Sequence, residues 1–184
     1  REYRFPPSTV EKLAYCGYIG RTRSTTGRDT TRHSLGVTTE KLVVVTVGGG
    51  EDGCQVLDHY LAGLAQHPAP FPMKTLMICG PEMAAARRGE IRQRAEILPE
   101  VMVRDFSDDL MALMDAADLV VAMGGYNTTC EIMTLRKRAI LVPRIRPVKE
   151  QWIRAQRLAS LGLVRVIQSD QSTPQKMIRM VYEE

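Results

Sequence analysis

The sequence predicts a three-layer α/β domain with a mostly parallel six-stranded sheet. From residue 41 onward, strand-sized apolar runs alternate with helix-sized segments, the order typical of parallel strands joined by crossover helices. Several runs are continuously apolar and β-branched, as in residues 42–47 (LVVVTV), which indicates strands buried on both faces. With 184 residues, 44% of them hydrophobic, the chain is long enough to bury one such core.

Residues 1–40 differ from the rest and are expected to form an interdomain linker followed by a mobile basic loop. Residues 1–12 contain a Pro-Pro pair and are expected to be extended. Residues 21–32 are almost wholly Thr, Ser, Arg and Gly, a composition typical of a solvated loop. A phosphate-binding loop is the alternative for this segment.

The first strands and helices follow from periodicity. Residues 42–47 are the first strand, and apolar positions at helix spacing predict a helix over 53–66. The apolar run 75–79 is the second strand. Residues 81–97 then form a long helix with arginines on its outward face, and 101–106 form the third strand.

The middle elements carry a capping signal. Ser107 is expected to cap a helix over 107–116, with two aspartates in the first turn, where carboxylates favour the helix dipole. Residues 118–123 (DLVVAM) are the fourth strand, and 127–137 form the helix that follows it.

The last elements complete the alternation. Residues 139–143 are the fifth strand, 149–161 a helix that a glycine ends, and 163–167 the sixth strand. Thr173 and Pro174 then open a final helix in the usual order of cap and proline.

Composition excludes several classes of protein. The net charge of +4 fits anionic ligands or an acidic membrane surface, but it is not the dense basic stripe of a nucleic-acid binder. No run approaches the ~18 apolar residues of a membrane-spanning helix. The four cysteines have no C-x-x-C spacing, which disfavours a zinc knuckle and fits a reduced, cytoplasmic compartment.

The turn after the first strand is glycine-rich, and ligands of such sheets bind beyond the carboxyl ends of the strands. Residues 48–53 (GGGEDG) fit G-x-G-x-x-G, in which Gly48, Gly49 and Gly50 would let the backbone approach a diphosphate. A dinucleotide site needs an acidic residue about 20 residues on, and residues 67–72 contain none. Phosphate binding of some kind is therefore favoured, with a merely tight turn as the alternative.

The turn after the fourth strand is the second candidate. Gly124 and Gly125 precede small hydroxyl residues at a helix start, which predicts an anion or hydroxyl site. However, Thr128 and Glu131 also have the spacing of a capping box, in which the carboxylate binds only a backbone amide. The spacing alone does not decide between these roles for Glu131.

Residues 143–156 (PRIRPVKEQWIRAQ) form the third candidate. Glu150 and Gln151 lie near the start of a helix on the binding side and offer both donors and acceptors for sugar hydroxyls. The alternative is a solvated first turn with Trp152 packed inward. Three nearby cations are expected to be solvated rather than phosphate ligands: Arg144, Arg146 and Lys149.

In this order and spacing the motifs resemble a known family. They are the glycine turn at 48–50, DFSDDL at 105–110, ADLVVAMGGYNTTCEI at 117–132 and ILVP…EQ..RA..L..LG over 140–162. Together they resemble the C-terminal half of GT-B glycosyltransferases, above all the family that includes the peptidoglycan N-acetylglucosaminyltransferase. The resemblance covers residues 42–167, and residues 14–21 (AYCGYIGR) resemble the segment that crosses from the N-terminal domain of such enzymes.

The resemblance implies one half of a GT-B fold, with a Rossmann-like domain over 41–184 that binds a UDP-sugar donor. It implies that backbone groups at Phe106 and Ser107 read the uracil edge and that Glu131 accepts from the ribose hydroxyls. It implies that Glu150 and Gln151 hold the transferred sugar. The turns near the diphosphate would be formed by Gly48, Gly49, Gly50, Gly124, Gly125 and Thr128.

Two departures from the family pattern bear on the sugar. Val148 stands where an Asp is frequent, and Glu150 stands where a Gln is common. The implied donor is therefore a UDP-N-acetylhexosamine or a UDP-hexose.

The implied function is donor binding in an inverting glycosyltransferase without metal or cofactor, since the sequence has no D-x-D motif. The catalytic base and the acceptor site are expected in an N-terminal domain that this chain lacks, so the chain alone should bind donor without turnover. His33, His59 and His67 are expected to be structural. A nucleotide-sugar epimerase or hydrolase and a non-enzymatic dinucleotide-binding module are the alternatives. The expected location is the cytoplasm, with peripheral contact with the inner membrane face or a lipid acceptor left open.

Overall fold

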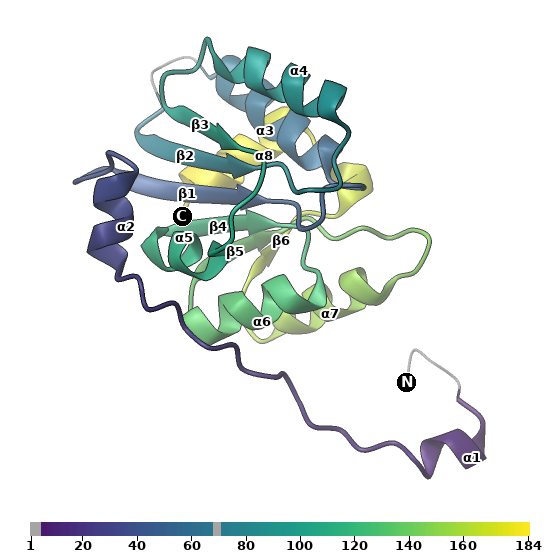
Figure 1. The fold of residues 1–184 in the computed structure, drawn as a ribbon. Coiled ribbons are helices and arrows are strands. Elements are labelled where there is room, and N and C mark those ends of the chain that lie inside the picture. The colour runs from purple at the N-terminus through teal and green to yellow at the C-terminus, as the bar shows by residue number, and fades with distance from the viewer. Residues whose placement is uncertain (1–4, 68–70) are drawn as a thin grey trace.

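In the computed structural model, which describes residues 5–67 and 71–184, the strands form one all-parallel sheet (Figure 1). The order of the six strands is β3-β2-β1-β4-β5-β6. The strands are β1 (Lys41–Thr46), β2 (Met73–Ile78), β3 (Val101–Arg104), β4 (Leu119–Ala122), β5 (Arg138–Leu141) and β6 (Arg165–Val166). The predicted α/β fold is confirmed.

Helices cover both faces of the sheet (Figure 1). One face carries α3 (Cys54–Ala65), α4 (Ala85–Ala95) and α8 (Pro174–Tyr182). The other carries α5 (Leu110–Ala116), α6 (Tyr126–Leu135) and α7 (Glu150–Ser160), with α2 (Arg28–Ser34) against α5. The remaining short helices are α1 (Pro7–Val10) and the 3-10 helix η1 (Ser169–Gln171).

The continuous apolar run of β1 is explained by these two layers. Val43 and Val45 pack into the core under α3 and α8, whereas Leu42 and Val44 pack into the core under α5 and α6. All four side chains are fully buried. A central parallel strand therefore needs apolar residues at every position rather than at every second one.

The strand order places a crevice at the centre of the sheet. From β1 the chain moves outward through β2 and β3, then returns to add β4 on the opposite side of β1. The connections that leave β1 and β4 therefore diverge at the carboxyl edge, at the topological switch point where open α/β sheets bind ligands.

The expectation of a mobile loop over 21–32 is wrong from Arg28 onward, because α2 begins there. Arg28 and Arg32 donate to carbonyl groups at the C-terminal end of α5 at 2.6–3.0 Å, and both pair with Asp118. Burial opposes ionisation of Asp118, but the Leu42 amide and the two guanidiniums outweigh it and lower the pKa of that carboxyl. Charged side chains, not an apolar stripe, anchor this helix.

Other boundaries shift by a few residues. Residues 1–4 of the expected extended lead-in lie outside the described residues, and α1 forms at 7–10, with a proline in its first turn. Ser107 does not cap α5; Asp109 does, accepting from the Ala112 amide at 2.9 Å. Among the described residues, no helix is long and apolar enough to cross a membrane.

Candidate functional site

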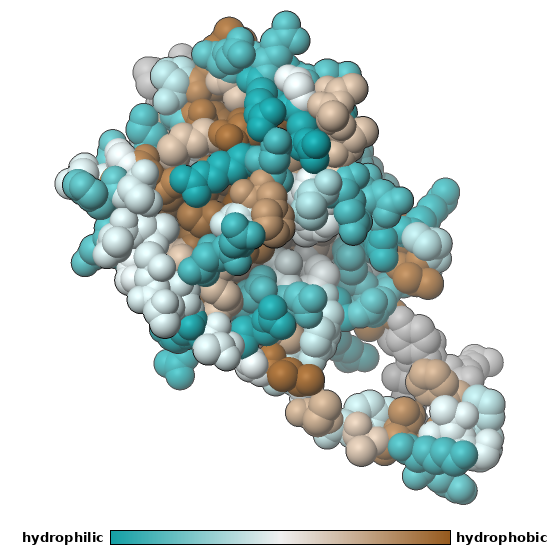
Figure 2. Space-filling view, viewed as in Figure 1, coloured by the Kyte–Doolittle hydropathy of each residue, from teal (hydrophilic) through white to brown (hydrophobic). Residues whose placement is uncertain are grey.

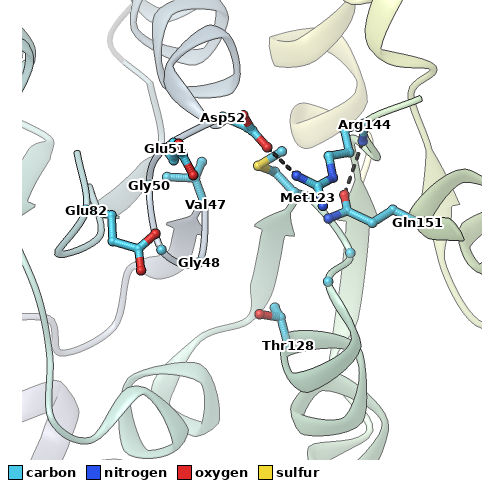
Figure 3. Close-up of a pocket in the computed structure, with 13 residues that line it drawn as sticks. Val47, Gly48, Gly50, Glu51, Asp52, Glu82, Met123, Thr128, Arg144 and Gln151 are labelled. Atoms are coloured by element: carbon cyan, nitrogen blue, oxygen red, sulfur yellow. Dashed lines mark hydrogen bonds and ion pairs between the residues drawn. The ribbon is translucent and has the colours of Figure 1, made fainter. Parts of the chain in front are cut away.

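A pocket of about 210 Å³ opens at the carboxyl ends of β1 and β4, at the switch point of the sheet (Figure 3). The β1–α3 turn forms one wall, and the β4–α6 turn with the start of α6 forms the other. Of the predicted site residues, those that line it are Gly48, Gly49, Gly50, Gly124, Gly125, Thr128 and Gln151. Phe106, Ser107, Glu131 and Glu150 are outside this lining.

Sequence reasoning missed part of the lining. The residues it did not assign to the site are Val47, Glu51, Asp52, Glu82, Met123 and Arg144. Most of them lie in turns that follow a strand. Their position at the carboxyl edge of the sheet could therefore have identified them as site residues from the sequence. Three of the missed residues are carboxylates on the side of β1 and β2, which makes that wall of the pocket acidic.

The β1–α3 turn packs tightly on the β2–α4 turn. The Glu82 amide donates to the Gly49 carbonyl at 2.8 Å. A Cβ on Gly50 would lie 2.3 Å from the Cys79 carbonyl oxygen, and one on Gly80 would lie 2.4 Å from the Gly48 carbonyl oxygen. The contact between the two turns leaves no room for a side chain at Gly50 or Gly80, and this alone requires glycine there.

The β4–α6 turn is open on the pocket side. Gly125 is the N-cap residue of α6, with no capping side chain among the described residues. No described heavy atom other than its chain neighbours lies within 4 Å of where a Gly125 Cβ would stand. The first amides of a helix lack intrahelical partners and carry the positive end of its dipole, so this wall can bind an anion.

Glu131 is not part of a capping box. Because α6 begins at Tyr126, Thr128 is already inside the helix and cannot be its cap. Glu131 lies one turn further along, on the same side as Thr128, and is buried with 7% exposure. Burial raises the pKa of its carboxyl, and the Arg21 guanidinium, 3.7 Å away, opposes part of the rise. The capping interpretation of Glu131 is therefore wrong. Its buried carboxylate lies one helical turn from Thr128, which lines the pocket.

Arg21 reaches Glu131 because the segment before α2 lies along α6. The Arg21 amide donates to Thr134 Oγ1 at 3.1 Å, and the Ile19 amide donates to the Tyr126 hydroxyl at 3.3 Å. The rings of Tyr18 and Tyr126 stack with centroids 6.0 Å apart. These contacts place a cation from the start of the chain over the second turn of α6.

Glu150 and Gln151 separate at the start of α7. Gln151 lines the pocket, and its Oε1 accepts from the Arg144 amide at 3.2 Å. Glu150 is exposed and pairs with Arg154, whose guanidinium donates to the Gly124 carbonyl at 3.0 Å. Arg144, expected to be solvated, forms an ion pair with Asp52 at the edge of the pocket (Figure 3).

The remaining candidates lie further away. Phe106 is exposed after β3, and Ser107 Oγ accepts from the Asp109 amide at 3.3 Å. His59 Nδ1 lies 2.9 Å from Ser172 Oγ, and the His67 ring packs against Phe71. In the part of the chain that the structure describes, no three His, Cys, Asp or Glu side chains converge as a metal site.

Comparison with known families decides what this domain is. The profile of the glycosyltransferase family 28 C-terminal domain matches residues 42–184. The chain belongs to this family. This match confirms the resemblance inferred from the sequence motifs. The residues that line the pocket all lie within the matched range, 42–184.

Curated relatives carry the name UDP-N-acetylglucosamine--N-acetylmuramyl-(pentapeptide) pyrophosphoryl-undecaprenol N-acetylglucosamine transferase. The protein of Haemophilus influenzae (strain PittEE) is 29% identical over 141 residues, 76% of this chain and 38% of the relative. That of Actinobacillus pleuropneumoniae serotype 5b (strain L20) is 23% identical over 137 residues, 74% of this chain and 38% of the relative. The family 28 domain thus spans well under half of the length of these relatives.

Solved structures share the fold. MurG of Acinetobacter baumannii superimposes with a TM-score of 0.69 at 20% identity, covering 90% of this chain and 46% of that one. The glycotransferase of kitacinnamycin superimposes with a TM-score of 0.60 at 20% identity, covering 93% of this chain and 38% of that one. At these identities the likeness establishes the architecture of the family 28 domain, one half of a GT-B fold, and nothing finer.

Proposed function

We propose that this chain is the donor-binding half of an inverting, metal-independent glycosyltransferase that uses a UDP-sugar. The observation that carries the proposal is the pocket at the β1–β4 switch point, with the open Gly125 turn and the start of α6 as one wall. The relatives' name specifies UDP-N-acetylglucosamine as their donor. A UDP-N-acetylhexosamine or a UDP-hexose is therefore the donor class proposed for this chain.

The charges around the pocket orient the donor. Carboxylates line the wall beside β1, whereas the first amides of α6 face the pocket from the other side. The diphosphate therefore binds at Gly124, Gly125 and Thr128, where the helix dipole favours an anion. Glu131, one turn away, accepts hydrogen bonds from the two ribose hydroxyls, and the uracil extends toward Phe106 and Ser107.

The same wall serves the chemical step. When the bond between the anomeric carbon and the diphosphate oxygen breaks, negative charge develops on the leaving UDP. Amides fixed at the start of α6 stabilise that charge without reorganising. In the proposed reaction they take the role that a metal ion would have in neutralising the leaving diphosphate. Gln151, whose Oε1 is held by the Arg144 amide, keeps its Nε2 to donate to a hydroxyl of the transferred sugar.

The acceptor and the catalytic base are assigned to a preceding domain, with the described segment before α2, residues 5–27, as the linker to it. This assignment is supported by hydrophobic residues on the arm that carries α1, brown and tan in Figure 2. Val10 and Ile19 are more than half exposed there, as expected of a surface that packs against another domain. Both halves are proposed to work in the cytoplasm.

A calorimetric titration of the chain with UDP, UDP-N-acetylglucosamine and NADH tests the proposal. Both UDP ligands should bind and NADH should not. Glu131→Ala should weaken UDP binding about 10- to 100-fold, the effect of losing hydrogen bonds to a charged acceptor. Glu131→Gln, which keeps one acceptor oxygen, should lose less.

Thermal unfolding of each variant verifies that the domain is still folded. Equal UDP affinity in folded Glu131→Ala would remove the ribose role of this carboxylate. Binding of NADH with no binding of UDP would contradict the proposed function itself.

A further inference from the structure

A second cavity, here called the back cavity, adjoins the donor pocket. Its volume is about 430 Å³, and it is formed by the β1–α3 turn, the segment after β5 and the η1 region. Its lining combines apolar side chains with hydroxyl, amide, carboxylate and guanidinium groups: Gln55, Val56, Val142, Ile145, Arg146, Ser169, Asp170 and Ser172. This mixture of donors, acceptors and apolar atoms suits a sugar and its substituents.

The two cavities meet at a single partition. Asp52, Met123 and Arg144 line both of them, and the Asp52–Arg144 ion pair joins the β1–α3 turn to the segment after β5 (Figure 3). The side chains of the pair are 48% and 36% exposed. Ion pairs this exposed contribute little to stability, so the partition can open at small cost.

Arg144 is also incompletely bonded where it stands. Its backbone amide is fixed by Gln151 Oε1 at 3.2 Å, and its guanidinium is paired with Asp52. Its Nε is buried and has no hydrogen-bond partner among the described residues. A donor of this kind is stabilised by any acceptor that reaches it, and a sugar hydroxyl or acetamido oxygen is such an acceptor.

We propose that the Asp52–Arg144 ion pair sets the size of the sugar that this site accepts, by closing the donor pocket off from the back cavity. A diphosphate held at the start of α6 places its sugar beside Gln151, and Arg144 is the next side chain along that wall. With the pair closed, the sugar ends at Arg144. With the pair open, a substituent on the sugar extends into the back cavity.

Because this rests on the proposed function, the test compares two donors of equal charge, UDP-glucose and UDP-N-acetylglucosamine. Their affinities for the chain are measured by calorimetry in the wild type, Asp52→Ala and Arg144→Ala. Both variants should raise the affinity ratio of UDP-N-acetylglucosamine to UDP-glucose by up to about fivefold, because opening an ion pair this exposed costs at most about 1 kcal/mol.

The two variants change the charge of the pocket in opposite directions. Asp52→Ala should therefore strengthen binding of every UDP ligand and Arg144→Ala should weaken it, while the ratio moves the same way in both. Glu51→Ala is the matched control, since it removes the same charge from the same turn without touching the pair. Its ratio should equal that of the wild type.

The outcomes separate the two proposals. Three results would overturn the role of the pair while leaving the proposed function standing, provided that UDP ligands still bind. The affinity ratio could stay unchanged in Asp52→Ala and Arg144→Ala, it could move in opposite directions in these two variants, or it could shift equally in Glu51→Ala. A wild-type chain that binds neither donor would overturn the proposed function, and the role of the pair with it.

Discussion

The two glycine turns of the pocket have the same sequence character but different reasons for their glycines. At Gly50 in the β1–α3 turn, protein atoms occupy the space where a side chain would stand, since a Cβ there would lie 2.3 Å from the Cys79 carbonyl oxygen. In the β4–α6 turn, the space beside Gly125 holds no described atom within 4 Å. The fold fills the space beside Gly50, whereas the space beside Gly125 is open to a ligand.

This difference changes how a glycine-rich turn is interpreted. Strand, glycines and helix occur in both turns, and the sequence pattern favours phosphate binding in each. The structure ties Gly50 to the neighbouring β2–α4 turn and leaves Gly125 facing the pocket. A ligand role is therefore better supported for the second turn than for the first, although the first matches the longer motif.

The largest expected effect is on folding, from Gly50→Ala. Gly50 has φ +98° and no room for a Cβ beside the Cys79 carbonyl. We expect a loss of about 2–4 kcal/mol in the free energy of unfolding, from backbone strain together with overpacking. Urea denaturation with linear extrapolation measures it.

Gly48→Ala is the control for this prediction. Gly48 also has positive φ, +66°, but no described atom outside its chain neighbours would meet its Cβ, so strain alone should cost about 1 kcal/mol. Equal losses in the two variants would show that backbone conformation, rather than contact between the turns, selects the glycines.

The next effect is on binding, from Gly125→Ala. Its φ of −56° suits any residue, so the free energy of unfolding should stay within about 1 kcal/mol of the wild type. A methyl group would instead stand between the diphosphate and the α6 amides, and UDP affinity should fall about tenfold or more, about 1.4 kcal/mol.

Gly89→Ala supplies the matched control, because it adds the same methyl group in open space on α4, away from the pocket. It should leave UDP affinity unchanged. An unchanged affinity in Gly125→Ala would contradict the assignment of the β4–α6 turn to the diphosphate.

Most of the fold was predictable because it depends on local patterns. Alternating apolar runs and helical periodicity located all six strands, and the parallel sheet followed from their order. The helix α2 was missed because its anchors, Arg28 and Arg32, are cations that bind carbonyl groups of α5 more than 80 residues away. No composition rule identifies a guanidinium that the fold will bury.

The site was predictable where it follows strand ends, and not where it depends on distant pairs. Gly124, Gly125 and Thr128 came from their place after β4 and do line the pocket. The pairing of Arg21 with Glu131 and of Arg144 with Asp52 joins segments far apart in the chain. Spacing within one segment carries no information about such contacts.

The smallest effect concerns Gly49, which differs from Gly50 in what it would meet. A Cβ on Gly49 would lie 2.8 Å from Glu82 Oε2, the end of a flexible and exposed side chain that can move into solvent. Gly49→Ala should therefore cost only about 0.5 kcal/mol. This loss in the free energy of unfolding should disappear when Gly49→Ala is combined with Glu82→Ala, a coupling that urea denaturation of the double-mutant cycle measures.

A loss as large as that of Gly50→Ala, unrelieved by Glu82→Ala, would mean that the backbone of the whole β1–α3 turn requires glycine. The contact between the turns would then be a consequence of its glycines rather than their cause.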